Sequence, residues 1–272
     1  MDNSLIRTLK GINAMPFAFS MKHYQVFGDT TSKMKDQELT SVESWDALRI
    51  DHPFFSISSD REEWLAASEV LVKKDGQDNR LIERAQDIVS LLRREKIERV
   101  FSVGVGGAAL EYQIKKLMPE ISIVCSDYSS VTVERLKRVF TESDGIVEFD
   151  IINGDWKEIQ DSYLGPKSVC MIYRIDASFS DEEWTRVFGG IATASIDNVL
   201  VVPTGTLTML SIFNRKKREV RWFLKRMPVV FSGYLRTKHR FREQWGQWYS
   251  EEEYSFGGLA GFLLRRKVNI AV

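Results

Sequence analysis

The stretch RVFSVGVGGAALEYQIKKLMPEISIVCSD, residues 99–127, decides how the rest of the chain folds. Its first apolar run, residues 100–103, is short and rich in β-branched and aromatic residues, as expected for a buried parallel strand. Residues 104–107, Gly-Val-Gly-Gly, predict a sharp turn in which a ligand can approach bare backbone. A helix is expected over residues 108–117, because apolar residues recur near one face. A second strand then ends at Asp127.

This order of elements also predicts a ligand. Free N–H groups at the helix N-terminus favour an anionic or carboxylate-bearing molecule. An acid at the tip of the second strand can accept hydrogen bonds from a ribose. Gly104, Gly106 and Ala109 fit the pattern G-x-G-x-x-G/A, and Asp127 follows Gly104 by 23 positions, near the ~20 expected of a ribose acid. Enzymes that use S-adenosylmethionine share this spacing, so the turn alone leaves the nucleotide open. A turn that needs glycine only for packing is the alternative without a ligand.

Length and composition limit the class of protein. The 272 residues suit one large α/β domain with additions, or two small ones, and 43% hydrophobic residues suffice for a normal core. Lys plus Arg balances Asp plus Glu at 38 each, so no overall field selects nucleic acid. The chain lacks an apolar run of about 18 residues and a signal-like N-terminus, which predicts a cytoplasmic protein. Cys125 and Cys170 fall in predicted strands, so neither a disulfide framework nor a metal site is expected.

Two regions are expected along the chain. Residues 1–77 form an N-terminal extension of aromatic–proline pieces without clear periodicity, with one predicted helix over residues 60–71. We interpret this extension as a cap over the mouth of the main domain, and a purely structural cover is an equal alternative. Residues 78–272 form the main domain, with a helical insert at residues 204–247.

The main domain is predicted to be α/β, with a doubly wound, mostly parallel seven-stranded sheet, because strands alternate with helices. Further strands are expected at residues 147–152, 169–172 and 198–202. A capping box at residues 180–183 begins the helix before the last of these strands. Near the C-terminus, runs at residues 248–254 and 259–267 are joined by Ser-Phe-Gly-Gly, which predicts a hairpin. The sheet therefore ends in an antiparallel strand.

With these features in place, residues 78–206 and 248–268 resemble the class I S-adenosylmethionine-dependent methyltransferases. The glycine turn at residues 104–107 resembles the first motif of that family, and Asp127 lies where the family has its ribose-binding acid. Gly154-Asp155 resembles the motif after the third strand, whose acid holds the adenine amino group. An antiparallel final strand is also how the family ends its sheet.

The resemblance implies a cofactor, S-adenosyl-L-methionine, and a set of residues that hold it. Residues 103–107 would line the methionine tail with Glu111 in support, and Asp155 would accept from adenine, with a helix cap as its alternative role. The implied cofactor-binding residues are Val103, Gly104, Val105, Gly106, Gly107, Glu111, Asp127, Tyr128, Asp155, Trp156 and Tyr173. The implied reaction is methyl transfer, with O-methylation of a small-molecule or glycan-type acceptor as our interpretation.

Two departures from the family pattern keep other functions open. Ser102 stands where the family often has an acid, and Ala108 stands where it has a third glycine. A methyltransferase-like binding protein without catalysis is therefore one alternative. An NAD(P)-dependent oxidoreductase that uses the same glycine turn is another, although Gly154-Asp155 and the antiparallel last strand count against it.

Methyl transfer requires the acceptor to lie in line with the methyl group, and a base assists where the acceptor is a hydroxyl. The candidate catalytic residues are Asp176, just after the fourth strand, and His239. Asp176 has an alternative role as a cap of the following segment. A lone histidine is also commonly structural or solvated.

The predicted insert carries a strong positive charge. Residues 215–242 contain eleven Lys or Arg and one acid, Glu219, for a formal charge of +10. One interpretation is a solvated basic face at a homodimer interface. A second is a site for an anionic acceptor, or a peripheral contact with an anionic membrane through residues 215–242. A third is RNA; nucleic acid is the least favoured partner because no recognisable RNA-binding module is present.

Overall fold

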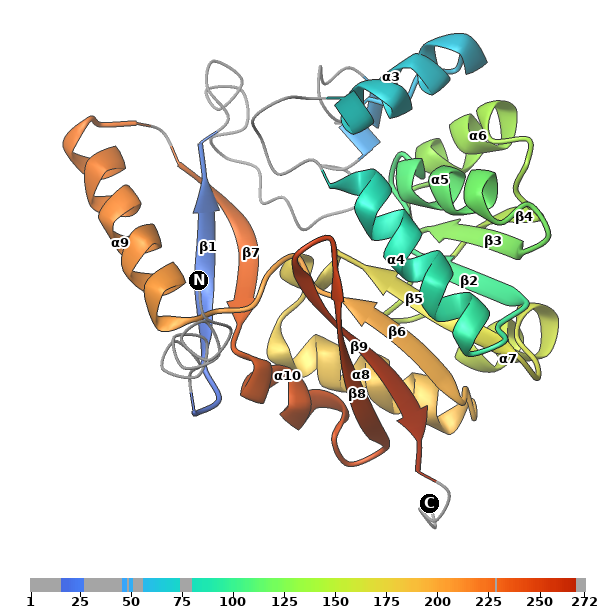
Figure 1. Cartoon of the computed structure of the whole chain (residues 1–272). Coiled ribbons are helices and arrows are strands. Elements are labelled where there is room, and N and C mark those ends of the chain that lie inside the picture. Colours follow the sequence, from blue (N-terminus) through green and yellow to red (C-terminus); the bar gives the residue numbers. More distant parts are fainter. Residues whose placement is uncertain are drawn as a thin grey trace, which may run out of the picture.

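The computed structural model describes residues 16–26, 46–47, 49–50, 56–73, 80–227 and 229–267. In this part of the chain, a seven-stranded sheet is covered by helices on both faces, and a two-stranded sheet lies beside it (Figure 1). None of the helices in these ranges is both long enough and apolar enough to cross a membrane.

The large sheet has the strand order β4-β3-β2-β5-β6-β9-β8. Its parallel strands are β2 (Arg99–Val103), β3 (Ser122–Asp127), β4 (Gly145–Glu148), β5 (Ser168–Tyr173) and β6 (Asn198–Val202). β9 (Leu259–Arg266) runs antiparallel to β6, and β8 (Tyr249–Phe256) forms the edge. The predicted doubly wound sheet with an antiparallel end is confirmed. Its strand order reverses between β2 and β5, and ligands bind beyond the C-terminal ends of strands at such a point.

One predicted strand is displaced along the chain. The third parallel strand was expected at residues 147–152, but β4 covers Gly145–Glu148. The chain turns after this strand because Oδ1 of Asp150 accepts hydrogen bonds from the backbone N–H groups of Ile152 (2.8 Å) and Asn153 (3.3 Å). An aspartate that bonds to the backbone two residues on favours a turn over an extended strand.

The helices cover the sheet in two layers. Clusters of buried side chains place α3 (Arg61–Lys73), α4 (Leu81–Arg94), α5 (Ala109–Leu117) and α6 (Ser130–Val139) on one face of the sheet. The other face carries α7 (Trp156–Tyr163), α8 (Asp181–Thr193) and α10 (Lys238–Trp245). Neighbouring strand residues point to opposite faces, so Val100 joins the first cluster and Phe101 the second.

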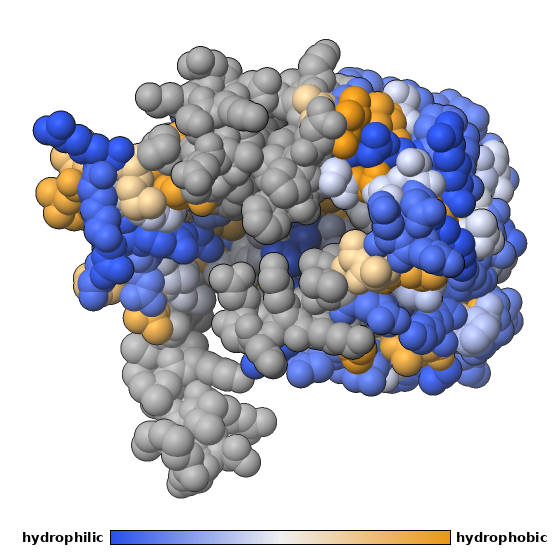
Figure 2. Space-filling view, turned by 90° about the horizontal axis from the view of Figure 1, so that it is seen from above, coloured by the Kyte–Doolittle hydropathy of each residue, from blue (hydrophilic) through white to orange (hydrophobic). Residues whose placement is uncertain are grey.

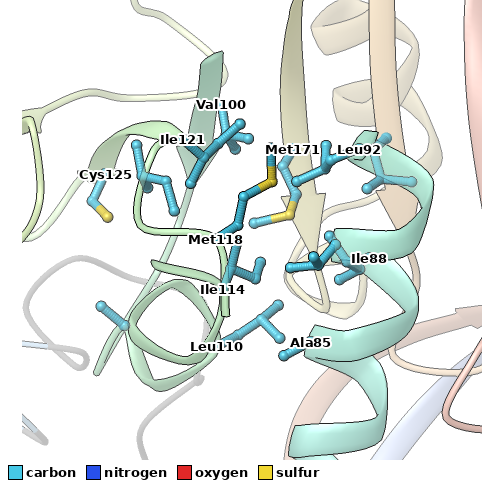
Figure 3. Close-up of a cluster of buried hydrophobic side chains, with 14 of the residues drawn as sticks. Ala85, Ile88, Leu92, Val100, Leu110, Ile114, Met118, Ile121, Cys125 and Met171 are labelled. Carbon is cyan, nitrogen blue, oxygen red and sulfur yellow. The ribbon is translucent and has the colours of Figure 1, made fainter. Parts of the chain in front are cut away.

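The core between α4, α5 and the sheet positions the glycine turn. Ala85 and Ile88 of α4 face Leu110 and Ile114 of α5, and Met171 of the sheet belongs to the same cluster (Figure 3). All five side chains are at most 3% exposed. Because a well-packed interior resists shifts of even one methylene group, this core fixes the start of α5, and with it the turn that precedes α5.

The two-stranded sheet joins segments far apart in sequence. β1 (Ser20–Gln25), from the N-terminal extension, pairs antiparallel with β7 (Val230–Arg236), from the insert. The insert is helical in α9 (Met209–Leu224) and α10, as predicted, but its middle is a strand. Residues 229–231, Val-Val-Phe, and Tyr234 are β-branched or aromatic, and such residues favour strands over helices.

Candidate active site

The glycine turn lies between β2 and α5. The backbone N–H groups of Gly104 and Val105 both donate to the carbonyl of Ser126 on β3, at 2.7 and 3.1 Å. Gly104 and Gly106 have φ values of +67° and +54°, a region that favours glycine. Ala108 also has a positive φ of +55°, which costs a non-glycine residue about 1 kcal/mol. The chain thus keeps a glycine-like backbone at Ala108, the position where the family it resembles has a third glycine.

Asp127 lies directly against this turn. Its carboxylate is 5% exposed; Oδ2 accepts from the N–H of Gly106 at 3.0 Å and Oδ1 from the N–H of Ser129 at 3.1 Å. Burial raises the pKa of Asp127, although the two N–H groups and Arg49 act in the opposite direction. A carboxylate oxygen can accept more than one hydrogen bond, so both oxygens retain capacity for ribose hydroxyls. The structure therefore brings together the turn and the predicted ribose acid.

A second buried carboxylate lies on the other side of the turn. Glu111, in the first turn of α5, is 2% exposed, and its Oε1 accepts a hydrogen bond of 2.7 Å from the hydroxyl of Ser102. Ser102 stands where the resembled family often has an acid, so the missing carboxylate comes from α5 instead. Burial raises the pKa of Glu111 to about 7, and the hydrogen bond from Ser102 partly opposes this.

This shift predicts a pH-dependent stability for Glu111→Gln. A carboxyl group whose pKa is higher in the folded than in the unfolded state stabilises the fold fully below its unfolded-state pKa. This contribution is lost as the pH rises through the folded-state pKa. The variant should match the wild type near pH 4.5, and above pH 7 its free energy of unfolding should be higher by about 3 kcal/mol. Urea unfolding at both pH values measures the difference. Exposed Glu120→Gln is the control, and a pH-independent Glu111→Gln effect would contradict the assignment.

The N-terminal extension contributes two side chains to the turn. Nη2 of Arg49 is 2.8 Å from the point where a Cβ on Gly106 would lie. Burial lowers the pKa of Arg49, while the negative charge of Asp127 acts to raise it. Nε1 of Trp64 on α3 donates to the carbonyl of Gly107 at 2.9 Å. Sequence reasoning missed Arg49, because this residue belongs to no motif and is brought to the turn only by the tertiary fold.

Three hydrogen bonds hold the segment around Arg49 against α6. The hydroxyl of Ser129 donates to Oδ1 of Asp46 at 2.5 Å, and Nη1 of Arg135 donates to the carbonyl of Arg49 at 2.9 Å. Nη1 of Arg135 also donates to the carbonyl of Ile57 at 2.5 Å. The described residues between positions 46 and 57 thus lie across the end of β3 and the start of α6, near Asp127.

The other implied cofactor residues lie less directly at the turn. Tyr128 is half-buried beside Asp127, and the hydroxyl of Tyr173 accepts from Arg84 at 3.4 Å. Asp155 is exposed and caps α7 through the N–H groups of its next residues. Trp156 is 5% exposed in the core, with its ring centroid 4.8 Å from that of Phe149. Their cofactor roles stay predictions, and the contacts of Asp155 and Trp156 are those of a helix cap and a core residue.

The two candidate bases have different environments. Asp176 is 1% exposed, its Oδ1 accepts from the N–H of Thr204 at 2.5 Å, and its Oδ2 has no partner among the described residues. Burial raises the pKa of Asp176. His239 is exposed on α10, well away from α5 and the glycine turn (Figure 1). Both roles stay predictions, and the geometry favours Asp176.

A buried ion-pair cluster supports the segment that carries Asp176. Arg236 of β7 is fully buried; its Nη1 donates to the carbonyl of Asp176 at 2.8 Å and its Nε to Oδ1 of Asp181 at 2.6 Å. Gly233 also lies so close to this segment that a Cβ there would be 1.8 Å from the carbonyl oxygen of Ala177. The two-stranded sheet is thereby fixed against the chain that follows β5.

Solved structures with the same architecture identify the fold. Human N-acetylserotonin methyltransferase, in complex with S-adenosylmethionine, matches with a TM-score of 0.50 and 14% identity over 88% of this chain and 70% of that chain. An O-methyltransferase family protein from Burkholderia thailandensis matches with a TM-score of 0.51 and 15% identity over 87% and 66%. Magnesium protoporphyrin IX methyltransferase from Synechocystis, with bound S-adenosylhomocysteine, matches with a TM-score of 0.51 and 14% identity over 76% of this chain and 98% of that chain.

These three likenesses concern the fold, since identity is low. The chain spans about two thirds of the length of the first two proteins and nearly all of the third. No protein-family model and no curated protein matches the sequence.

Proposed function

We propose that this chain, which has the fold of the class I S-adenosylmethionine-dependent methyltransferases, is itself such an enzyme, and that it O-methylates a small-molecule or glycan-type acceptor. The observation that carries the proposal is the bond of 3.0 Å between Oδ2 of Asp127 and the N–H of Gly106. It joins the ribose acid of β3 to the glycine turn of β2 at the reversal point of the sheet, where nucleotide ligands bind.

The residues present fit the cofactor. Gly104 and Gly106 leave the backbone bare, and each has a positive φ that other residues adopt at a cost. Asp127 offers two oxygens to the ribose, and the buried carboxyl of Glu111 would support the part of the turn that lines the methionine tail. Bound S-adenosylmethionine supplies an electrophilic methyl group on a sulfonium. The chain then contributes orientation and, for a hydroxyl acceptor, removal of a proton.

Asp176 is the residue we propose as the base. Its Oδ2 has no hydrogen-bond partner among the described residues, and burial raises its pKa above that of an ordinary carboxyl group, a direction that suits a general base. It follows β5, the strand next to β2, so it lies on the same edge of the sheet as the glycine turn. The β1/β7 sheet, fixed beside this segment, is our candidate for part of the acceptor site.

Calorimetric titration tests the cofactor assignment. We expect micromolar binding of S-adenosylmethionine and S-adenosylhomocysteine and no binding of NADH. Binding of NADH alone would overturn the proposal in favour of an oxidoreductase. Failure to bind any of the three would favour a protein that keeps the fold without catalysis.

A further inference from the structure

The outer face of α9 is apolar and exposed. α9 contains no buried residue, and Met209, Phe213, Val220, Phe223 and Leu224 are 56, 66, 58, 83 and 75% exposed. At 3.6 residues per turn these side chains form a stripe on one face of the helix, interrupted midway by Lys216. Soluble proteins rarely leave such a stripe uncovered, and it commonly marks an interaction surface.

The opposite face of α9 fixes the direction of this stripe. Ile212 packs on the cluster formed by Met21, Leu207 and Leu235, and Nη1 of Arg215 lies 3.2 Å from Nδ1 of His23 on β1. From the middle of the stripe, Ile212 lies about 75° and Arg215 about 135° around the helix, both in the same direction. The contacts with the two-stranded sheet therefore leave the stripe pointing outward, at the end of the molecule that α9 occupies in Figure 1.

Positive charge accompanies the stripe. Lys216, Lys217 and Arg221 lie within or beside it and are exposed, and Glu219 is the only acid of the helix. Seen from above, hydrophilic and hydrophobic side chains lie side by side at this end of the molecule (Figure 2). Lys216 pairs with Glu219 at 2.6 Å, which leaves α9 with a clear excess of positive charge.

The basic residues of the segment from Arg236 onward are paired with acids of the protein. Arg236 and Arg240 pair with Asp181, at 2.6 and 2.8 Å. Lys238 pairs with Glu253, and Arg242 with Glu251. The positive charge of residues 215–242 that faces solvent is therefore concentrated in residues 215–226, on α9 and directly after it.

We propose that α9 docks on a lipid surface that contains anionic headgroups, with its axis parallel to that surface. The apolar stripe would enter the boundary between headgroups and acyl chains, and the lysine and arginine heads would contact lipid phosphates. A second copy of the chain fits this face less well, because a symmetric contact would bring the cations of two α9 helices together. The docking is independent of methyl transfer.

Vesicle sedimentation of the full chain without cofactor tests the proposal. We expect binding to phosphatidylcholine vesicles that contain phosphatidylserine, little binding to phosphatidylcholine alone, and a loss of binding as salt increases. The pair Phe213→Ser and Phe223→Ser should weaken binding at least about tenfold. The pair Lys217→Gln and Arg221→Gln should weaken binding about tenfold and flatten the salt dependence. Ile82→Ser, which removes an exposed apolar side chain from α4, should bind like the wild type.

The other outcomes would overturn the proposal. Absence of wild-type binding to the anionic vesicles excludes lipid docking. If light scattering then shows a dimer that Phe213→Ser with Phe223→Ser dissociates, the stripe is a contact between copies. Equal weakening by Ile82→Ser would mean that binding is not specific to α9. Circular dichroism of each variant confirms that a change in binding does not reflect unfolding.

Discussion

Replacement of Asp181 with alanine should lower the free energy of unfolding by about 3 kcal/mol. Asp181 accepts hydrogen bonds from Nε of Arg236 at 2.6 Å, Nε of Arg240 at 2.8 Å, the hydroxyl of Ser20 at 2.9 Å and Nε2 of Gln244 at 2.9 Å. The side chain of Arg236 is 0% exposed, so the variant leaves a buried cation without its acid. Arg236 keeps its hydrogen bonds to the carbonyl groups of Asp176 and Phe179. We therefore expect a loss at the lower end of the range typical of broken buried ion pairs.

Glu243→Ala is the matched control. Glu243 also pairs with Arg240, at 2.7 Å, but its side chain is 53% exposed, and exposed pairs contribute less than about 1 kcal/mol. Urea unfolding monitored by circular dichroism measures both variants. A loss for Asp181→Ala no larger than that for Glu243→Ala would mean that the cluster does not hold β1, β7 and α10 to α8.

The Asp181 effect should also depend on pH. Burial alone would raise the pKa of Asp181, but the hydrogen bonds from Arg236, Arg240 and Ser20 outweigh burial and hold this pKa below its ordinary value. Such a group stabilises the fold fully above its unfolded pKa, and the contribution is lost as the pH falls through the folded value. The difference between wild type and Asp181→Ala should therefore be constant near neutrality and shrink in acid, below about pH 4.

The sequence predicted those parts of the fold whose determinants lie close together in the chain. Residues 99–127 contain β2, the glycine turn, α5 and β3 in one continuous pattern, and all four were found. The capping box of Ser180 and Glu183 is present, with both of its hydrogen bonds. The pairing of β1 with β7 was missed, since it joins residues about 210 positions apart. No local pattern encodes that choice of partner.

In the candidate site, too, the sequence predicted some contacts and missed others. The contact between Asp127 and the turn was predictable, because parallel strands of known spacing bring their C-terminal ends to one edge of the sheet. The bond between Ser102 and Glu111 explains how the chain compensates for its lost acid, yet the sequence shows only two separate polar residues. Arg49 carried no signal at all. Its position depends on how the extension packs against α6, through contacts such as that of Asp46 with Ser129.

Asp127→Ala should weaken binding of S-adenosylhomocysteine at least about tenfold, because the variant removes both acceptors for the ribose hydroxyls. The fold should survive, since Asp127 lies at the end of β3 and its partners are two backbone N–H groups at the edge of the sheet. Calorimetric titration measures the change, and Asp155→Ala, at an exposed helix cap, is the comparison. An unchanged affinity in Asp127→Ala would mean that the ribose assignment is wrong.

Arg49→Ala should act in the opposite direction and tighten binding about tenfold. The guanidinium of Arg49 lies against Gly106 and within the field of Asp127, so it would compete with a ribose bound at Asp127 as proposed. It also repels the sulfonium. On this proposal, cofactor binding displaces Arg49, which lowers the apparent affinity of the wild type. Arg49→Lys keeps the positive charge on a smaller ammonium group, so its gain in affinity should be smaller than that of Arg49→Ala.

Binding of two ligands distinguishes this displacement of Arg49 from the opposite hypothesis, in which Arg49 binds the carboxylate of the cofactor. S-adenosylhomocysteine has that carboxylate, and 5′-methylthioadenosine lacks it. If Arg49 competes for the ribose site, Arg49→Ala tightens binding of both ligands by similar factors. If Arg49 holds the carboxylate, the variant weakens S-adenosylhomocysteine alone. The gain from removing Arg49 is expected to depend on the charge of Asp127, with which Arg49 interacts. The double variant should therefore bind neither ligand better than Asp127→Ala does.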